Sequence, residues 1–390
     1  MADLAYITPN ILKWARESAK MTIDIAARKI PITVEQLDAF ENGNLYPTIS
    51  QAQKLAHLYK RPFALFFLPK IPRDFTPLQD YRKNGSLELG TGSTFIIREI
   101  QQKQNWISEV YKENGESILP FVGKFTINDN PIDVANDILK TLGISPFNYT
   151  TDNPIREWIN KSERESIFVS RTSFIHSHLK LDSEELQGFA ISDLYAPFVF
   201  INSDDWDAPQ LFTLVHELAH IWIAETGISN DIEPSIEDKD KFHPIELFCN
   251  EVAANALMPK DLMSSLDYST FDNSVTLLKT AKKIGVSSFA LIVRALNLKI
   301  INNTEYKKLK EEADSSYRLF LKKEEEKKLR QKNATGGPNY FLLQVNRNSR
   351  LFTHTVLDAF KSGFIEPTQA SNLLNVKINK FPQLEAQLYK

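Results

Sequence analysis

Residues 213–223 read TLVHELAHIWI, a stretch in which two histidines and a glutamate lie among apolar residues. At 100° per residue the stretch predicts a helix whose apolar stripe consists of Leu214, Val215, Leu218, Ala219 and Trp222. The opposite side of this helix carries His216, Glu217 and His220, together with Thr213. Two imidazoles one turn apart can bind a single zinc ion. Glu217 beside them can act as the catalytic base that takes a proton from the attacking water.

A different interpretation of the same stretch is a solvated helix face on which two histidines occur by chance. In a chain of this composition the pattern HExxH arises by chance with a probability on the order of 1%. The apolar stripe also indicates a helix that packs against a core. We therefore favour a metal site.

Two imidazoles leave a catalytic zinc ion one protein ligand short, and the segment ELFCNEVAANALMP at 246–259 offers a candidate. On a helical wheel Glu246 shares one stripe with Cys249, Asn250, Ala253 and Leu257. A carboxylate on an apolar face is costly unless it is paired or binds a metal, so Glu246 is the expected third ligand. Asn250, one turn further on, is expected to orient a ligand histidine.

Several residues near these motifs allow two interpretations. Cys249 is either a thiolate ligand or a small buried residue, and we favour the buried residue. Glu251 is expected on the polar side of its helix as a surface charge. His243 either stabilises the oxyanion formed during hydrolysis or is an ordinary loop residue. His176 and His178 form either a second metal site or part of a polar loop, which we favour because no carboxylate or cysteine adjoins them.

The remaining pattern predicts an α+β fold that is predominantly helical. The first seventy residues or so predict short helices with a tight turn between the second and the third, which is typical of a helix-turn-helix module. Strands are expected at 166–171, 188–193 and 197–202, followed by helices almost to the end. The strand PFVFIN at 197–202 is either an edge that receives substrate as an added strand or a buried strand beneath the metal-site helix.

These elements divide the chain into five regions. We expect a helix-turn-helix domain at 1–75, a helical connecting region at 76–165 and a zincin-like metallopeptidase core with a small sheet at 166–270. A helical segment at 271–335 and a small C-terminal helical domain at 336–390 follow. The charged run at 322–332 is expected to be a solvated helix face.

Composition excludes several classes of protein. A formal net charge of −3 over 390 residues provides no overall field toward nucleic acid or anionic membrane, so any nucleic-acid role must come from a local patch. A single cysteine permits no intrachain disulfide and indicates a reducing compartment. The start MADLAYITPN lacks the features of a secretory signal, and no apolar run is long enough for a bilayer. We expect a soluble, cytoplasmic protein with no membrane partner.

The expected recognition helix of the N-terminal domain is unusual for DNA binding. It contains Glu35, Asp38 and Glu41 and no lysine or arginine, and acidic side chains oppose contact with phosphates. Gln36 offers a base contact, and Arg28 and Lys29 lie nearby in the sequence. The domain therefore binds either DNA, through these three residues, or another protein.

The motifs together resemble a known family. TLVHELAHIWI followed by ExxCNxxAAxxLMP is similar to the ImmA/IrrE metallopeptidases, zinc enzymes of bacteria and their mobile elements. The resemblance implies a small α+β peptidase core with one zinc ion, and it places the family's ligands on His216, His220 and Glu246. The N-terminal segment, with FENGNLYPT and LYKRPFALFFLP, resembles the Cro/repressor-type (XRE-like) helix-turn-helix often fused to these peptidases. Residues 282–306 resemble the helical segment that follows the family's core.

This resemblance implies a zinc-dependent endopeptidase that cleaves a specific regulatory protein. The substrate would be a repressor or an antitoxin-like partner, and its cleavage would relieve transcriptional repression under stress or under phage or mobile-element control. The alternatives are a non-cleaving DNA-binding transcription regulator and an antitoxin of a toxin–antitoxin pair.

Overall fold

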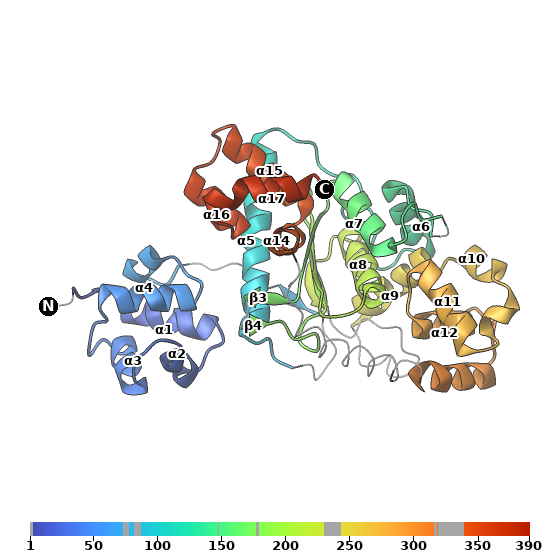
Figure 1. Cartoon of the computed structure of the whole chain (residues 1–390), viewed down its shortest axis with the longest axis horizontal. Coiled ribbons are helices and arrows are strands. Elements are labelled where there is room, and N and C mark those ends of the chain that lie inside the picture. Colours follow the sequence, from blue (N-terminus) through green and yellow to red (C-terminus); the bar gives the residue numbers. More distant parts are fainter. Residues whose placement is uncertain are drawn as a thin grey trace. The chain divides into compact units, whose positions relative to one another are not determined.

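The computed structural model describes residues 3–72, 78–81, 87–146, 148–176, 179–229, 243–315, 318 and 339–390 (Figure 1). The chain divides into two compact units. The first comprises Met1–Pro77, Leu87–Gln101 and Phe174–Glu185, and the second comprises Leu78–Ser86, Gln102–Ser173 and Leu186–Lys390. The charged run expected at 322–332 lies outside the described residues. Every helix that is described is too short or too polar to span a lipid bilayer.

The first unit begins with short helices whose ends follow capping signals in the sequence. They are α1 (Pro9–Ser18), α2 (Ile23–Lys29), α3 (Val34–Glu41), α4 (Ile49–Leu58) and the 3-10 helix η1 (Phe63–Phe67). Thr22, Thr33 and Thr48 cap the second, third and fourth helices through their hydroxyl groups. Thr33 and Thr48 form full capping boxes with Gln36 and Gln51. In each box the threonine hydroxyl accepts from the glutamine main-chain N–H, and the glutamine side chain accepts from the threonine main-chain N–H. The expected short helices are therefore present, and their assignment as a helix-turn-helix stays a prediction.

The first unit also contains the beginning of α5 (Thr91–Glu113) and a small hairpin. The hairpin consists of β3 (Phe174–His176) and β4 (Leu179–Lys180), which pair in antiparallel fashion. Glu185 accepts hydrogen bonds from the Gly90 main chain at 2.9 Å and from the Ser93 hydroxyl at 2.7 Å. A carboxylate at the first turn of a helix in this way neutralises free N–H groups and the positive end of the helix dipole.

The second unit contains a mixed sheet with strand order β1-β7-β5-β6-β2. Its strands are β1 (Gln79–Asp80), β7 (Gly227–Ser229), β5 (Gly188–Ile191), β6 (Phe198–Asn202) and β2 (Phe168–Thr172). β5 runs antiparallel to both its neighbours, whereas β1 pairs with β7, and β2 with β6, in parallel. The three expected strands are present within two residues of their predicted limits. The expectation of helix from 203 onward is wrong at β7, whose three residues are too few for a periodic pattern.

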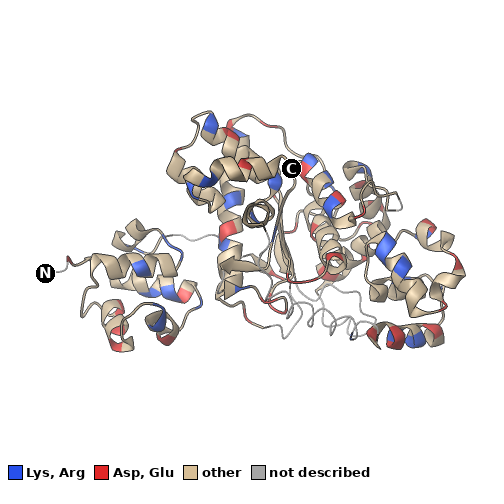
Figure 2. Ribbon diagram, in the orientation of Figure 1, with Lys and Arg blue, Asp and Glu red and all other residues tan. Residues whose placement is uncertain are grey.

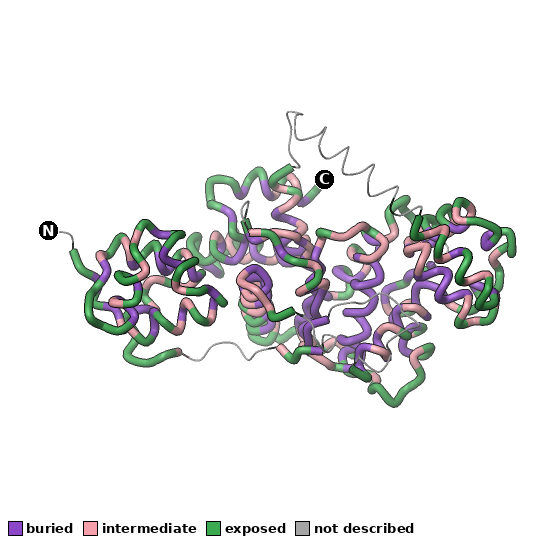
Figure 3. Tube along the Cα trace, turned by 90° about the horizontal axis from the view of Figure 1, so that it is seen from below, coloured by how far each residue is buried: buried purple, intermediate pink, exposed green. Residues whose placement is uncertain are grey.

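Helices cover both faces of this sheet. α8 (Asp207–Trp222) packs on β5 and β6, and α9 (Pro244–Leu257) packs on α8 and on α6 (Pro131–Leu142). α14 (Tyr340–Asn348) packs on β2, on the other side of the sheet from α8 (Figure 1). The buried residues, purple in Figure 3, include all of β6 and α8 from Gln210 to Trp222. β6 is thus an interior strand beneath α8, and its interpretation as a substrate-receiving edge is wrong.

The remaining helices complete the second unit. After α9 come α10 (Lys260–Ser265), η3 (Tyr268–Phe271), α11 (Ser274–Ile284), α12 (Ser288–Asn297) and a helix over 303–315. α7 (Pro154–Arg164) precedes the sheet, and α15 (Arg350–Lys361), α16 (Pro367–Leu374), η4 (Ile378–Lys380) and α17 (Phe381–Leu388) follow α14. Buried hydrogen bonds anchor this C-terminal segment, among them Lys103 Nζ to Asn348 Oδ1 at 2.7 Å. The fold is predominantly helical α+β, as the sequence predicts.

One buried carboxylate holds α7 against the beginning of α15. Oε1 of Glu163 accepts hydrogen bonds from the Ser349 hydroxyl at 2.6 Å and from the Arg350 main-chain N–H at 2.9 Å. Burial raises the pKa of Glu163 from its ordinary value near 4.5 to about 7, although these hydrogen bonds act in the opposite direction. The folded protein therefore retains a proton on Glu163 at pH values where the unfolded chain has lost it.

We expect Glu163→Gln to remove a pH dependence of stability. In the wild type, the free energy of unfolding falls as the pH rises from about 4.5 to about 7, because only the folded state holds the extra proton there. The amide oxygen of glutamine can accept the same hydrogen bonds without a charge. Urea unfolding should therefore find the variant more stable than wild type at pH 8, by about 1–3 kcal/mol, and similar to it at pH 4. Parallel pH profiles for both proteins would contradict this assignment.

Candidate metal centre

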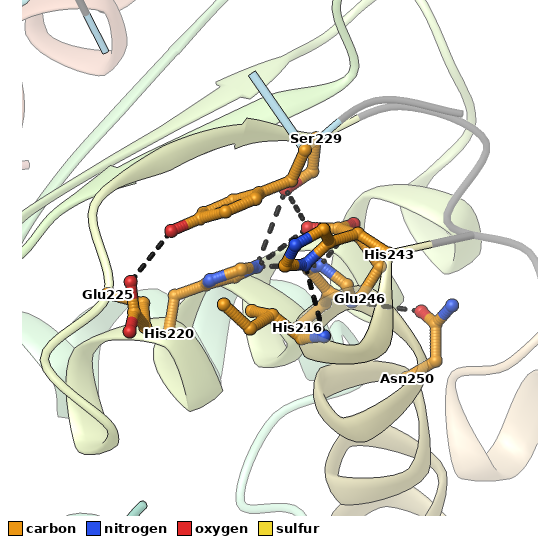
Figure 4. Close-up of polar contacts among 9 residues, drawn as sticks. His216, His220, Glu225, Ser229, His243, Glu246 and Asn250 are labelled. Atoms are coloured by element: carbon orange, nitrogen blue, oxygen red, sulfur yellow. Dashed lines mark hydrogen bonds and ion pairs between the residues drawn. The ribbon is translucent and has the colours of Figure 1, made fainter. Parts of the chain in front are cut away.

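Two consecutive helices bring two histidines and one glutamate together (Figure 4). Nε2 of His216 and Nε2 of His220, both on α8, are 3.1 Å apart. Glu246, in the first turn of α9, places Oε2 3.2 Å from the first nitrogen and Oε1 3.2 Å from the second. Among the described residues this is the one group of histidine, cysteine or acidic side chains with the geometry of a metal site.

The spacing of these donor atoms suits zinc. Tetrahedral zinc with bonds of about 2.0–2.1 Å holds neighbouring ligand atoms about 3.3 Å apart. The separations of 3.1 and 3.2 Å observed here match that value. Two imidazoles and one carboxylate are also a donor set of catalytic zinc sites, which keep a fourth position open.

The metal cluster lies entirely in the protein interior. His216 and His220 are 0% exposed and Glu246 is 2% exposed. The interpretation of 213–223 as a solvated helix face is therefore wrong, because the polar side of α8 is as buried as its apolar stripe. Ionisable groups in such a place are costly unless they are paired or bind a cation.

Burial and the contacts within the cluster shift the pKa values of Glu246 and His220. Burial alone would raise the pKa of Glu246, but the two neighbouring histidines lower it to about 2. Burial lowers the pKa of His220, against the opposing effect of Glu246. A carboxylate and a neutral imidazole are the protonation states that ligate zinc.

Glu217 follows His216 on α8 and is fully buried. Neither of its carboxylate oxygens has a hydrogen-bond partner within the part of the chain that is described, and the residue is 0% exposed. Burial, and then the charge of Glu246, raise its pKa well above the ordinary value, against a smaller opposing effect of Ser229. Gly188 on β5 gives it room, since a Cβ there would lie 2.6 Å from Cγ2 of Thr213 and 3.0 Å from Oε1 of Glu217.

Two further residues orient the expected ligands. Oδ1 of Asn250 lies 2.9 Å from Nδ1 of His216, so an N–H at Nδ1 leaves the lone pair of Nε2 directed toward the cluster. Asn250 thus lies within hydrogen-bond distance of His216, and its role in orienting that ring stays a prediction. Ser229 of β7 is fully buried and donates from its hydroxyl to Oε1 of Glu246 at 3.3 Å. Ser229 was missed because no motif marks it and its strand was not predicted.

Tyr81 is the second residue near the cluster that sequence reasoning missed. Its ring stacks on His220, with centroids 5.7 Å apart and planes 12° apart. Its hydroxyl donates to Oε2 of Glu225 at 2.7 Å. Burial, together with that hydrogen bond, raises its pKa. Tyr81 precedes the HExxH helix by more than a hundred residues, so only the fold reveals this contact.

The other candidates near the motifs lie as follows. His243 is exposed, caps α9 by accepting from the Ile245 main chain at 3.4 Å, and contacts Tyr81 with ring centroids 5.1 Å apart. Cys249 is buried, and burial raises its pKa well above the ordinary value, so it stays a neutral thiol outside the donor cluster. His176 is exposed on β3, whereas His178 lies outside the described residues.

Two further residues of α9 differ in their exposure to solvent. Glu251 is exposed, as expected for a surface charge. Asn255, one turn further along α9, is buried, and its side chain accepts from Arg294 of α12 at 2.6 Å and donates to the Glu251 main chain at 2.9 Å.

The N-terminal candidates lie on the surface of the first unit. Arg28 and Lys29 at the end of α2, and Gln36 on α3, are all exposed. However, Oε1 of Gln36 already accepts from the Thr33 main chain at 3.1 Å, which leaves its amide N–H groups for other contacts. Glu41 does not share the surface with Glu35 and Asp38, because it is buried and receives two hydrogen bonds from Arg16 at 2.7 and 2.8 Å. Figure 2 colours the acidic residues of the chain red and the basic residues blue.

Comparison with known proteins agrees with this geometry. Residues 163–296 match the model of a peptidase family described as the IrrE N-terminal-like domain. The matched segment runs from the end of α7 into α12 and includes His216, Glu217, His220 and Glu246. The resemblance to the ImmA/IrrE metallopeptidases is thereby confirmed. No curated protein matches the chain.

The geometry predicts that substitutions of two glutamates of α9 differ in their effect on zinc affinity. Glu246→Ala removes one of three donors and should lower zinc affinity by several orders of magnitude in competition with a chromophoric chelator. Glu251→Ala should leave the affinity unchanged and shift stability by less than about 0.5 kcal/mol, because the side chain is exposed. The opposite order of affinities would mean that Glu246 is not a ligand.

Proposed function

We propose that this chain, which carries an IrrE N-terminal-like peptidase domain at residues 163–296, is a zinc-dependent endopeptidase. The observation that supports the proposal best is the convergence of His216, His220 and Glu246 beside a buried carboxylate that has no described partner. A zinc site that only stabilises the fold does not require a buried carboxylate beside its ligands, whereas hydrolysis requires a general base next to the metal-bound water. The family match makes peptide bonds the expected substrate.

The residues around the cluster would divide the chemistry among them. Bound zinc would act as a Lewis acid on the scissile carbonyl and lower the pKa of the attacking water. Glu217 would accept the proton of that water and then donate it to the leaving amine. Asn250 would hold the His216 ring in the tautomer that ligates through Nε2, and Ser229 would fix the orientation of the Glu246 carboxylate.

We further propose that the substrate is a specific regulatory protein, a repressor or an antitoxin-like neighbour. Its cleavage would relieve transcriptional repression under stress or under phage or mobile-element control. The support is the family resemblance, together with an N-terminal set of capped helices of the kind that recognises DNA or a protein partner.

A second candidate function is a DNA-binding regulator that does not cleave, or an antitoxin that only holds its partner. One observation favours DNA binding: the ion pair with Arg16 removes Glu41 from the surface of α3. The donor set and the buried Glu217, whose carboxylate has no hydrogen-bond partner among the described residues, favour the peptidase over a purely binding role.

Glu217→Gln should separate chemistry from metal binding. The amide cannot accept a proton from water, so cleavage of a co-expressed protein encoded next to this chain should fall by about 10²-fold or more. Zinc content should remain one ion per chain, because Glu217 contributes no donor to the cluster. Glu251→Gln, an exposed change on the neighbouring helix, is the matched control and should cleave normally. Cleavage by the Glu217→Gln variant at a rate near wild type would exclude Glu217 as the base.

DNA binding by the full chain should depend on Arg28 and Lys29. Gel shifts with the protein's own promoter region should weaken steeply with added salt, because each phosphate contact releases counterions. Replacing both residues by alanine removes two exposed cations, so it should weaken binding and make the salt dependence less steep. Absence of any shift in the wild type, or a salt-insensitive one, would favour a role in recognising protein.

A further inference from the structure

The strand β7 lies between the metal cluster and a short segment of the chain's own sequence. Ser229, the last residue of β7, contacts Glu246 in the cluster. One edge of β7 pairs with β5. The other edge pairs in parallel with β1, with Gln79 opposite Gly227 and Asp80 opposite Ile228, and the Tyr81 N–H donates to the Ile228 carbonyl at 3.1 Å. Residues 78–81 therefore occupy the edge that β7 would otherwise offer to another extended chain.

Tyr81 anchors this segment directly over a metal-site residue. It is 3% exposed, and its ring lies flat against His220 and also contacts His243. Gln79 and Asp80, which precede it, are exposed. The contacts that hold the segment include the buried Tyr81 ring, its hydrogen bond to Glu225 and the strand pairing with β7.

Gly227 is the residue that allows so close an approach. A Cβ at this position would lie 2.2 Å from two carbons of the Tyr81 ring and 3.0 Å from the Gln79 carbonyl oxygen. No side chain can be accommodated there while the segment is in place. Substitution of Gly227 therefore offers a way to displace residues 78–81 without changing any of them.

An endopeptidase must bring the main chain of its substrate to the metal and to the base. His216, Glu217 and His220 are all 0% exposed in this conformation. An extended peptide cannot reach them, and the edge of β7 on which it would pair is already occupied. The conformation described here is therefore closed to substrate.

We propose that residues 78–81 form an intramolecular strand that holds the metal centre closed, and that this strand must leave β7 before an extended polypeptide can pair there and be cleaved. The partner that displaces it is an extended segment of the protein substrate, which gains the same main-chain hydrogen bonds from β7. The inference deepens the proposed peptidase function and rests on it for the cleavage step, whereas the closure itself can be tested with zinc alone.

The test compares the full-length wild type with Tyr81→Ala and Gly227→Ala. Stopped-flow mixing measures the rate of zinc uptake by the metal-free protein and the rate of zinc loss to excess chelator. If residues 78–81 close the site, both rates should rise about tenfold or more in both variants while the dissociation constant changes little. Hydrolysis of the co-expressed neighbour should also be faster than in wild type.

Tyr149→Ala is the matched control, because Tyr149 is a partly buried tyrosine of the same unit that contacts Trp158 and not the cluster. Its zinc rates should equal those of wild type. Gly227→Ala keeps the test decisive if loss of the Tyr81 ring prevents folding, since it leaves that side chain intact.

Three results have distinct meanings. Unchanged zinc rates in the folded variants would overturn the proposal. Faster loss with slower or unchanged uptake, and a weaker dissociation constant, would also overturn it, because Tyr81 would then only position His220. Faster exchange in both directions without cleavage of any polypeptide would support the closing strand and count against the proposed peptidase function.

Discussion

The meeting of two imidazoles and one carboxylate in the interior constrains much of the second unit. Such a group is stable only if its charges are matched and its orientations are held. The surroundings provide such contacts: Asn250 lies within hydrogen-bond distance of one ring, Ser229 donates to the carboxylate, and Gly188 leaves space for Glu217. α8 and α9 must therefore pack in one register. A shift of either helix by one residue would rotate its side chains by about 100° and turn its donor atoms away from the cluster.

Much of this arrangement could be predicted because a helix is determined largely by residues close together in the sequence. Each of the patterns that were recognised spans only one or two helical turns. They are the HExxH spacing, the carboxylate on the apolar stripe of α9 and the threonine caps of the first unit. Placing Glu246 inward and Glu251 outward needed only helix geometry. The resemblance to a peptidase family suggested which reaction the cluster could serve, and the family match at 163–296 agrees with that resemblance.

The remainder could not be predicted because it depends on pairing between distant segments. β7 has three residues and β1 two, too few for any alternation to be visible, yet they bring Ser229 and Tyr81 to the cluster. The position of PFVFIN inside the sheet follows from strand order, which a single sequence does not reveal. Likewise, the sequence around Glu41 suggests a surface acid, although in the structure Glu41 is buried and paired with Arg16. Local periodicity thus indicated the three residues that cluster in the structure, but not the residues that cover them.

The buried state of Cys249 has a consequence for oxidising conditions. It is the one sulfhydryl of the sequence, it lies three residues beyond Glu246, and it is shielded from solvent as a neutral thiol. Peroxides attack the thiolate, so this side chain is protected both by its protonation and by its lack of contact with solvent. The helix that carries Glu246 therefore holds no readily oxidised sulfhydryl, and mild oxidants that modify exposed thiolates should leave the packing of α9 unchanged.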